Sequence, residues 1–86
     1  MYELSQKVFD FIDTLFTEND AVVVKALLIE KCNDNLPFYS KMPKSEIDRI
    51  HLAVIKMSNG SYADLSSTVE VACIDWRDVL MNAVGQ

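Results

Sequence analysis

The 86-residue sequence has very few of the residues that interrupt regular structure, with only two glycines and two prolines. Sandwiches and barrels of short strands need frequent turn residues, so this scarcity argues against an all-β fold. Metal-ligating residues are also scarce, because Cys32, Cys73 and His51 are the only cysteines and histidine. With 18 residues between Cys32 and His51 and 21 between His51 and Cys73, they match no compact pattern of metal ligands.

No signal-peptide pattern and no long apolar run are visible in the sequence either. The N-terminal residues, Met1 to Glu3, lack the basic region with an apolar stretch behind it that marks a signal peptide. The most apolar stretch, residues 21–29, is interrupted by Lys25 and is shorter than the roughly 20 residues of a membrane span. We therefore expect a cytoplasmic protein with no membrane association, in which both cysteines are buried, reduced thiols.

Half of the residues in the sequence are hydrophobic, and 24% are charged. This composition excludes long disorder, which needs low hydrophobicity and high net charge, and the length fits a single helical domain, residues 1–86. Thirteen acidic and eight basic residues leave a net charge of −5. A surface that coats nucleic acid is therefore not expected, because phosphate binding needs an excess of Lys and Arg.

Residues 2–16 show helical periodicity. Five apolar residues fall on one arc of a helical wheel: Leu4, Val8, Phe11, Ile12 and Leu15. Tyr2, Phe9 and Phe16, spaced by seven residues, widen this face on one side. We expect these three aromatic side chains to pack in the core; the alternative is an exposed aromatic interface.

Residues 21–32 are apolar on nearly every side and predict a buried helix, capped by Asn19 or Asp20. The valines at 22–24 have strand propensity, but no comparable second segment exists to pair with them. Only three other helices are available to surround this one. We therefore expect a homodimer, because self-association would bury more of its surface.

Residues 33–43 predict a loop, because Pro37 disfavours helix at the residue before it. The loop contains three large apolar residues, Phe38, Tyr39 and Met42. We expect them to fold over the end of the bundle; the alternative is a loop that contacts a partner.

The third helix is predicted to begin between Pro43 and Ser45, where Ser45-x-x-Asp48 approximates a capping box. Its apolar stripe consists of Ile47, Ile50, Val54 and Met57. Asn59-Gly60 predicts its end, since glycine readily adopts the left-handed conformation that follows a helix.

Ser61 predicts the cap of a last helix, residues 62–83. Its apolar stripe keeps one helical phase throughout: Leu65, Val69, Ala72, Cys73, Trp76, Val79, Leu80 and Ala83. We expect a continuous helix with Trp76 as a core anchor; the alternative is a bend near Ile74, because Asp75 could cap a fresh helix. The four segments together predict an all-α fold, a compact bundle of four helices, the last one long.

The C-terminal third carries a spaced pattern: Ser58-x-Gly60, Leu65, Ala72 and Asp75-x-Arg77-Asp78-x-Leu80-x-x-Ala83. It resembles the closing helix of small, uncharacterised bacterial proteins that end in a D-W/Y-R-D-x-L helix. The resemblance implies a bacterial or phage-borne origin. It implies no activity, because that group has no established function.

No pattern predicts an enzyme, a cofactor or a metal. His51 lies at the edge of an apolar stripe without an orienting partner nearby in sequence, so we expect it to pack at the edge of the core. Asp75, Arg77 and Asp78 form the densest charge cluster, but no phosphate-binding loop accompanies them. We expect a solvated face with an ion pair to another helix; the alternative is a polar anchor for a partner.

Acidic charge and spare apolar residues favour a protein that acts by protein–protein interaction, as a regulator, an inhibitor (including one that mimics DNA) or a toxin-neutralising protein. The expected partner-binding residues lie on the last helix: Glu70, Ile74, Arg77, Asp78 and Met81. Ile74 and Met81 are seven residues apart and face away from the apolar stripe, with Glu70 and Arg77 framing them. They are therefore expected to anchor an unidentified protein partner.

The alternative function is nucleic-acid binding by the basic segment 41–56. It contains four cations, Lys41, Lys44, Arg49 and Lys56. The connection between the second and third helices takes about ten residues, which is long for a helix-turn-helix motif. Protein partners are therefore preferred over nucleic acid.

Overall fold

The computed structural model describes residues 4–33, 36 and 39–84. Within these residues the chain is all-α, as predicted, with no strand. Its elements are the helices α1 (Gln6–Leu15), α2 (Glu18–Lys31), α3 (Lys44–Ser58) and α4 (Tyr62–Val84) and the short 3-10 helix η1 (Tyr39–Lys41). None of these helices is long and apolar enough to cross a membrane.

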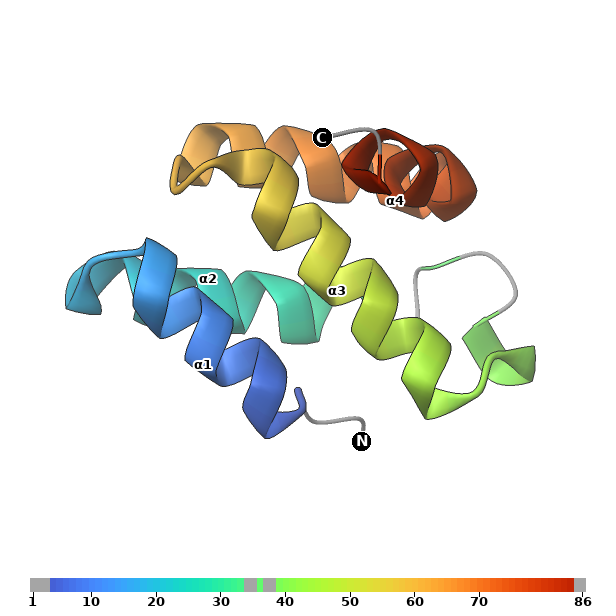
Figure 1. Ribbon diagram of the computed structural model, residues 1–86, viewed down its shortest axis with the longest axis horizontal. Coiled ribbons are helices and arrows are strands. Elements are labelled where there is room, and N and C mark those ends of the chain that lie inside the picture. Colours follow the sequence, from blue (N-terminus) through green and yellow to red (C-terminus); the bar gives the residue numbers. More distant parts are fainter. Residues whose placement is uncertain (1–3, 34–35, 37–38, 85–86) are drawn as a thin grey trace.

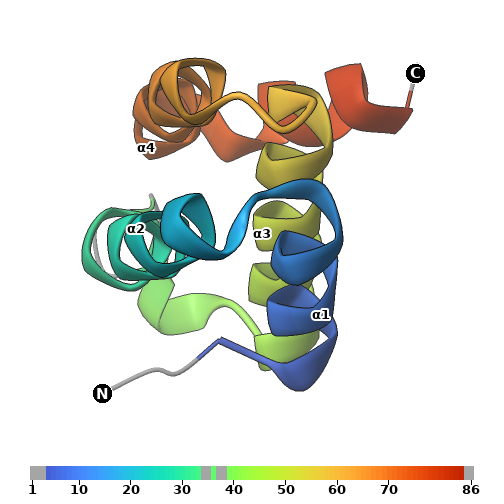
Figure 2. The same cartoon turned by 90° about the vertical axis from the view of Figure 1, so that its left-hand side faces the viewer.

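The four α-helices form a closed arrangement in which each packs mainly against two others. α1 contacts α2 and α3, α4 contacts α2 and α3, and the packing of α3 on α4 is the most extensive. Figure 1 shows α3 crossing the molecule diagonally, and Figure 2 shows α2 and the first part of α4 on one side of α3. One side of α2 is consequently left facing outward.

The core contains the predicted stripes of all four helices. Its largest fully buried aliphatic side chains come from α1, α2, α3 and α4: Val8, Ile12, Val24, Leu28, Ile50, Val54, Ile55, Leu65 and Val79. Phe16 is buried and Phe9 packs against the core, so the expected core role is confirmed for both, while Tyr2 lies outside the described residues. Leu15, however, is exposed, because α1 ends there and the chain turns away into α2.

The prediction that α2 is buried on every side is wrong. Val22 is 66% exposed and Val23 is 48% exposed, because α1 and α4 cover only the side that carries Ala21, Val24 and Leu28. The helix also begins earlier than predicted, with Thr17 rather than Asn19 or Asp20 as its cap; the Thr17 hydroxyl accepts a hydrogen bond from the Asp20 amide at 3.3 Å.

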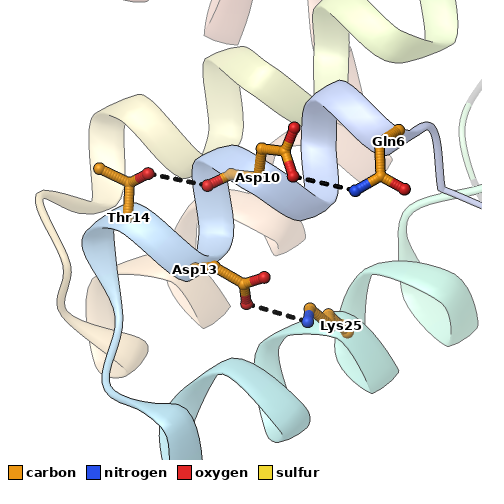
Figure 3. A network of polar contacts seen from close by, with 5 residues as sticks. All are labelled: Gln6, Asp10, Asp13, Thr14 and Lys25. Carbon is orange, nitrogen blue, oxygen red and sulfur yellow. Dashed lines mark hydrogen bonds and ion pairs between the residues drawn. The ribbon is translucent and has the colours of Figure 1, made fainter.

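An ion pair joins α1 and α2 at the surface. Nζ of Lys25 lies 2.9 Å from Oδ1 of Asp13 and 5.2 Å from the centroid of the Phe9 ring. In Figure 3 the Lys25 side chain points from α2 toward Asp13, while Gln6 and Thr14 donate to the side chain and carbonyl of Asp10. Lys25 is thus held on the α1 side of α2.

The loop before α3 folds onto the bundle as expected, since Tyr39 and Met42 pack against the core; Phe38 lies outside the described residues.

The predicted capping box is wrong. Pro43 is extended and occupies the cap position without a side-chain hydrogen bond, so Ser45 is already inside the helix.

The predicted end of α3 is confirmed. Asn59 and Gly60 have φ angles of 52° and 81°. A side chain at Gly60 would also bring a Cβ within 3.0 Å of the Leu15 carbonyl oxygen, so this turn needs glycine for two reasons. Ser61 then caps α4, as predicted, by accepting a hydrogen bond from the Asp64 amide at 3.3 Å.

The last helix is long, as predicted, but it is not continuous. Asp75 is non-helical, with φ −154° and ψ 92°, and α4 changes direction there, which Figure 2 shows plainly. The bend anticipated as the alternative is therefore correct, and the expected continuity is wrong. Trp76 directly after the break is half-buried and packs against the core, rather than being fully enclosed.

Candidate interaction surface

Asp75 creates the bend in α4 by replacing a helical backbone bond with bonds from its side chain. Its Oδ1 accepts hydrogen bonds from the backbone N–H of Arg77 at 3.1 Å and from Arg77 Nε at 3.3 Å. A carboxylate that accepts from the amide two residues ahead is the usual cap of a new helix. The expected ion pair to another helix is therefore wrong: Arg77 pairs with Asp75 inside α4.

Ile74 and Met81 are the most exposed large apolar residues among the described part of the chain, at 80% and 74%. Their predicted exposure is confirmed. They stand on opposite sides of the break at Asp75, so their seven-residue spacing no longer places them on one line. Glu70 accompanies Ile74 on the first part of α4, while Arg77 and Asp78 accompany Met81 on the second part, and all three are exposed.

The bend forms a groove on its inner side, with a cavity volume of about 250 Å³. Its lining combines apolar and polar residues from α3 and both parts of α4: Met57, Ser67, Thr68, Val71, Asp78, Val79 and Asn82. Asp78 was predicted as a site residue, whereas Val71, which is 43% exposed, and Met57 were not. The signal that could have revealed them was the capping tendency of Asp75, since a straight helix has no inner side.

A second groove of about 250 Å³ runs between α2 and the first part of α4. Leu27 and Val69 supply apolar surface, and Lys31 and Glu70 supply opposite charges. Cys73 also lines it and donates a hydrogen bond from Sγ to the Lys31 carbonyl at 3.2 Å. Burial raises the pKa of Cys73, and the neighbouring Lys31 opposes that shift, so the thiol is protonated at neutral pH.

Among the described residues, two further titratable groups lie in the interior, and both are uncharged at neutral pH. His51 is fully buried, deeper than the core-edge position predicted, and its Nε2 lies 2.7 Å from the carbonyl oxygen of Cys32. A carbonyl only accepts, so Nε2 carries the hydrogen, and burial lowers the pKa of the ring. Cys32 is buried as predicted, and burial raises its pKa to about 12.

The hydrogen bond between His51 and the Cys32 carbonyl is a contact between two helices. Both cysteines are free thiols. In the described ranges, no group of three or more His, Cys, Asp and Glu side chains is arranged to bind a metal. The His51–Cys32 bond joins the middle of α3 to the end of α2.

The basic segment is partly used inside the fold. Arg49 forms an ion pair with Glu46 at 3.0 Å. Lys56 donates from Nζ to the carbonyl of Ala83 at 3.1 Å, which stabilises the end of α4. Arg49 and Lys56, which were expected to contact phosphate, therefore already have partners in the chain.

Comparison of the chain with models of protein families, with curated proteins and with solved structures gave no match. The resemblance of the C-terminal third to small bacterial proteins accordingly stays a prediction.

Proposed function

We propose that this chain is a small acidic cytoplasmic protein that acts by binding another protein, as a regulator, inhibitor or toxin-neutralising protein, and that it catalyses no reaction. The observation that carries the proposal is the near-complete exposure of Ile74 and Met81 on either side of the bend at Asp75. Burying a side chain of this size on binding contributes about 1.5–3 kcal/mol.

Single exposed hydrophobic residues are common and need no explanation. Here the two most exposed ones flank a bend whose inner groove adds Met57 and Val71. Polar residues surround this apolar surface, which is the composition of a protein-binding patch. Ile74 and Met81 project from α4 beside this groove, so one partner can contact both the exposed side chains and the groove.

The charge of the surface indicates the chemistry of the partner. Asp75 already neutralises Arg77, which leaves Glu70 and Asp78 as the unmatched charges. A partner that places Lys or Arg beside apolar side chains is therefore favoured. The alternative function, nucleic-acid binding by residues 41–56, has less support because Arg49 and Lys56 are engaged within the chain.

The experiment that tests this proposal is affinity capture from the native host with the wild-type chain and with the double variant Ile74→Ser, Met81→Ser. The wild type should retain a discrete protein. Once purified, that protein should bind the wild type at least tenfold more tightly than it binds the double variant. The matched control is Val22→Ser, Val23→Ser, which removes two exposed apolar side chains from α2 and should leave capture unchanged.

Two results would count against the proposal. Equal capture by wild type and by the Ile74/Met81 variant would show that these two residues of α4 do not form the binding surface. Tight binding of a nucleic-acid duplex, lost on Arg49→Ala, Lys56→Ala and falling steeply with salt, would favour the alternative.

A further inference from the structure

The outward side of α2 is an apolar helix face that no described helix covers. Its buried side packs on α1 and α4, and its opposite side exposes Asn19, Val22, Val23, Ala26 and Glu30. Two exposed valines and an alanine in the middle of a surface helix are unusual for a monomer, because such a face is normally polar. α2 therefore carries apolar residues on both its outward and its inward side, but only the inward side packs against other helices.

The spacing of the central residues is symmetric. Asn19, Val23, Ala26 and Glu30 are separated by four, three and four residues, so they form one line along the helix that reads the same from either end. When two such helices pair in opposite directions, Val23 of each faces Ala26 of the other. Asn19 of each then faces Glu30 of the other, and an amide can donate to that carboxylate.

The charges on the edge of this face fit the same antiparallel pairing. Asp20, Leu27 and Lys31 follow one line on the side of α2 toward α4, where Leu27 and Lys31 line the α2–α4 groove. A twofold axis between antiparallel helices brings this edge of one copy against the same edge of the other, in the reverse direction. Asp20 at the start of one helix thereby meets Lys31 at the end of the other.

Parallel pairing would have the opposite result. It would place Glu30 against Glu30 on the central line of the face, and like charges at close range oppose association. The other edge of α2 offers no equivalent pair, because Lys25 there is held by Asp13 of α1. Charge complementarity therefore selects one orientation and one occupant.

We propose that the outward face of α2 binds a second copy of this chain, forming an antiparallel, twofold-symmetric homodimer. Ala26 near the centre lets the helix axes approach to about 8 Å. Each copy contributes one 14-residue helix, so the contact is smaller than a standard interface and the dimer dissociates in the micromolar range. This proposal is independent of the proposed function, which uses α4.

Sedimentation equilibrium over a concentration series tests the dimer. The wild-type mass should rise from 9.7 kDa toward twice that value at high micromolar concentration. The variant Val23→Glu, Ala26→Glu should stay monomeric throughout, with an unchanged circular dichroism spectrum, because both positions are exposed. The control Ile74→Ser, Met81→Ser should dimerise like the wild type, whatever its effect on partner capture.

Three results would overturn the dimer: a wild type that stays at 9.7 kDa at high micromolar concentration, a Val23/Ala26 variant that still dimerises, or dissociation caused by the Ile74/Met81 control. The first of these results is measured on the wild type alone, so it does not depend on whether a variant folds. The last would assign self-association to α4 instead.

Charge reversal tests the orientation. Asp20→Lys and Lys31→Asp should each weaken dimerisation about tenfold at low ionic strength, because each creates two like-charge contacts. The double reversal Asp20→Lys, Lys31→Asp should restore wild-type affinity. Glu18→Lys is the matched control, since it reverses a charge in the same first turn on the edge toward α1 and should change little. Single reversals without effect, or a double reversal that does not restore affinity, would contradict antiparallel pairing.

Discussion

The carbonyl oxygen of Cys32 accepts a hydrogen bond from Nε2 of His51 at 2.7 Å, which ties the end of α2 to the middle of α3. These residues are 19 positions apart in the sequence. The bond requires a neutral or protonated ring with hydrogen on Nε2, and full burial favours the neutral form. The stability of the fold is therefore linked to the protonation of His51.

The first prediction concerns pH. Burial lowers the pKa of His51 in the folded state below its ordinary value of 6.5, although the Cys32 bond and nearby Asp48 oppose the shift. The unfolded chain then binds more protons than the folded chain below that pH, so stability falls as pH decreases from 7 toward 5, by at most about 1.4 kcal/mol per pH unit. Urea unfolding at several pH values measures this slope.

The control for this prediction is His51→Gln, which keeps a donor for the Cys32 carbonyl but does not titrate. Its unfolding free energy should be less dependent on pH over the same range, even if its overall stability is lower. An identical slope in wild type and variant would show that other groups cause the dependence.

A second prediction concerns the bend in α4. Asp75→Ala removes the acceptor of the two Arg77 bonds and should lower the free energy of unfolding by about 0.5–2 kcal/mol. Asp78→Ala is the matched control, because it removes the same charge one turn later and should cost less. Thermal unfolding compares the two, and equal losses would mean that Asp75 acts by charge alone.

A third prediction compares two isoleucines on helices. Ile50 is fully buried in α3, so Ile50→Ala should cost about 2–5 kcal/mol. Ile74 is 80% exposed, so Ile74→Ala should change stability by no more than about 0.5 kcal/mol. Chemical denaturation gives both values. A large loss at Ile74 would show that it is packed in solution.

A fourth prediction concerns thiol reactivity. Cys73 is half-buried at a groove, whereas Cys32 is fully buried and its pKa is raised to about 12. A thiol reagent at neutral pH should therefore modify one cysteine of the native chain, Cys73, and both after unfolding in denaturant. Mass spectrometry of the digested chain identifies the site. Rapid labelling of Cys32 in native buffer would contradict its burial.

Sequence reasoning succeeded where one residue type has one strong conformational preference. The turn at Asn59 and Gly60 was predictable because few other residues adopt positive φ at low cost. Thr17 was missed because Asn19 and Asp20 have the same capping tendency and lie close by, so chemistry alone does not select the first turn.

The errors at Asp75 and α2 arise from competing signals. The apolar stripe keeps its phase through Asp75, but the local bonds from Arg77 outweigh continuity of the helix there. In α2 the apolar residues point in all directions, so periodicity gives no buried side, and only the positions of α1 and α4 decide that Val22 faces out. Because α4 was expected to be straight, the groove at the bend was not predicted either.

The most direct test of the central claim, that the exposed residues of α4 bind another protein, is photo-crosslinking in the native host. A photoreactive residue replaces Ile74 or Met81 in turn, and a third chain carries it at the exposed Lys7 of α1 as a control. Positions 74 and 81 should both cross-link to one and the same protein of discrete mass, and position 7 should not. No product above the control, or a product formed only with a second copy of the chain, would contradict the account.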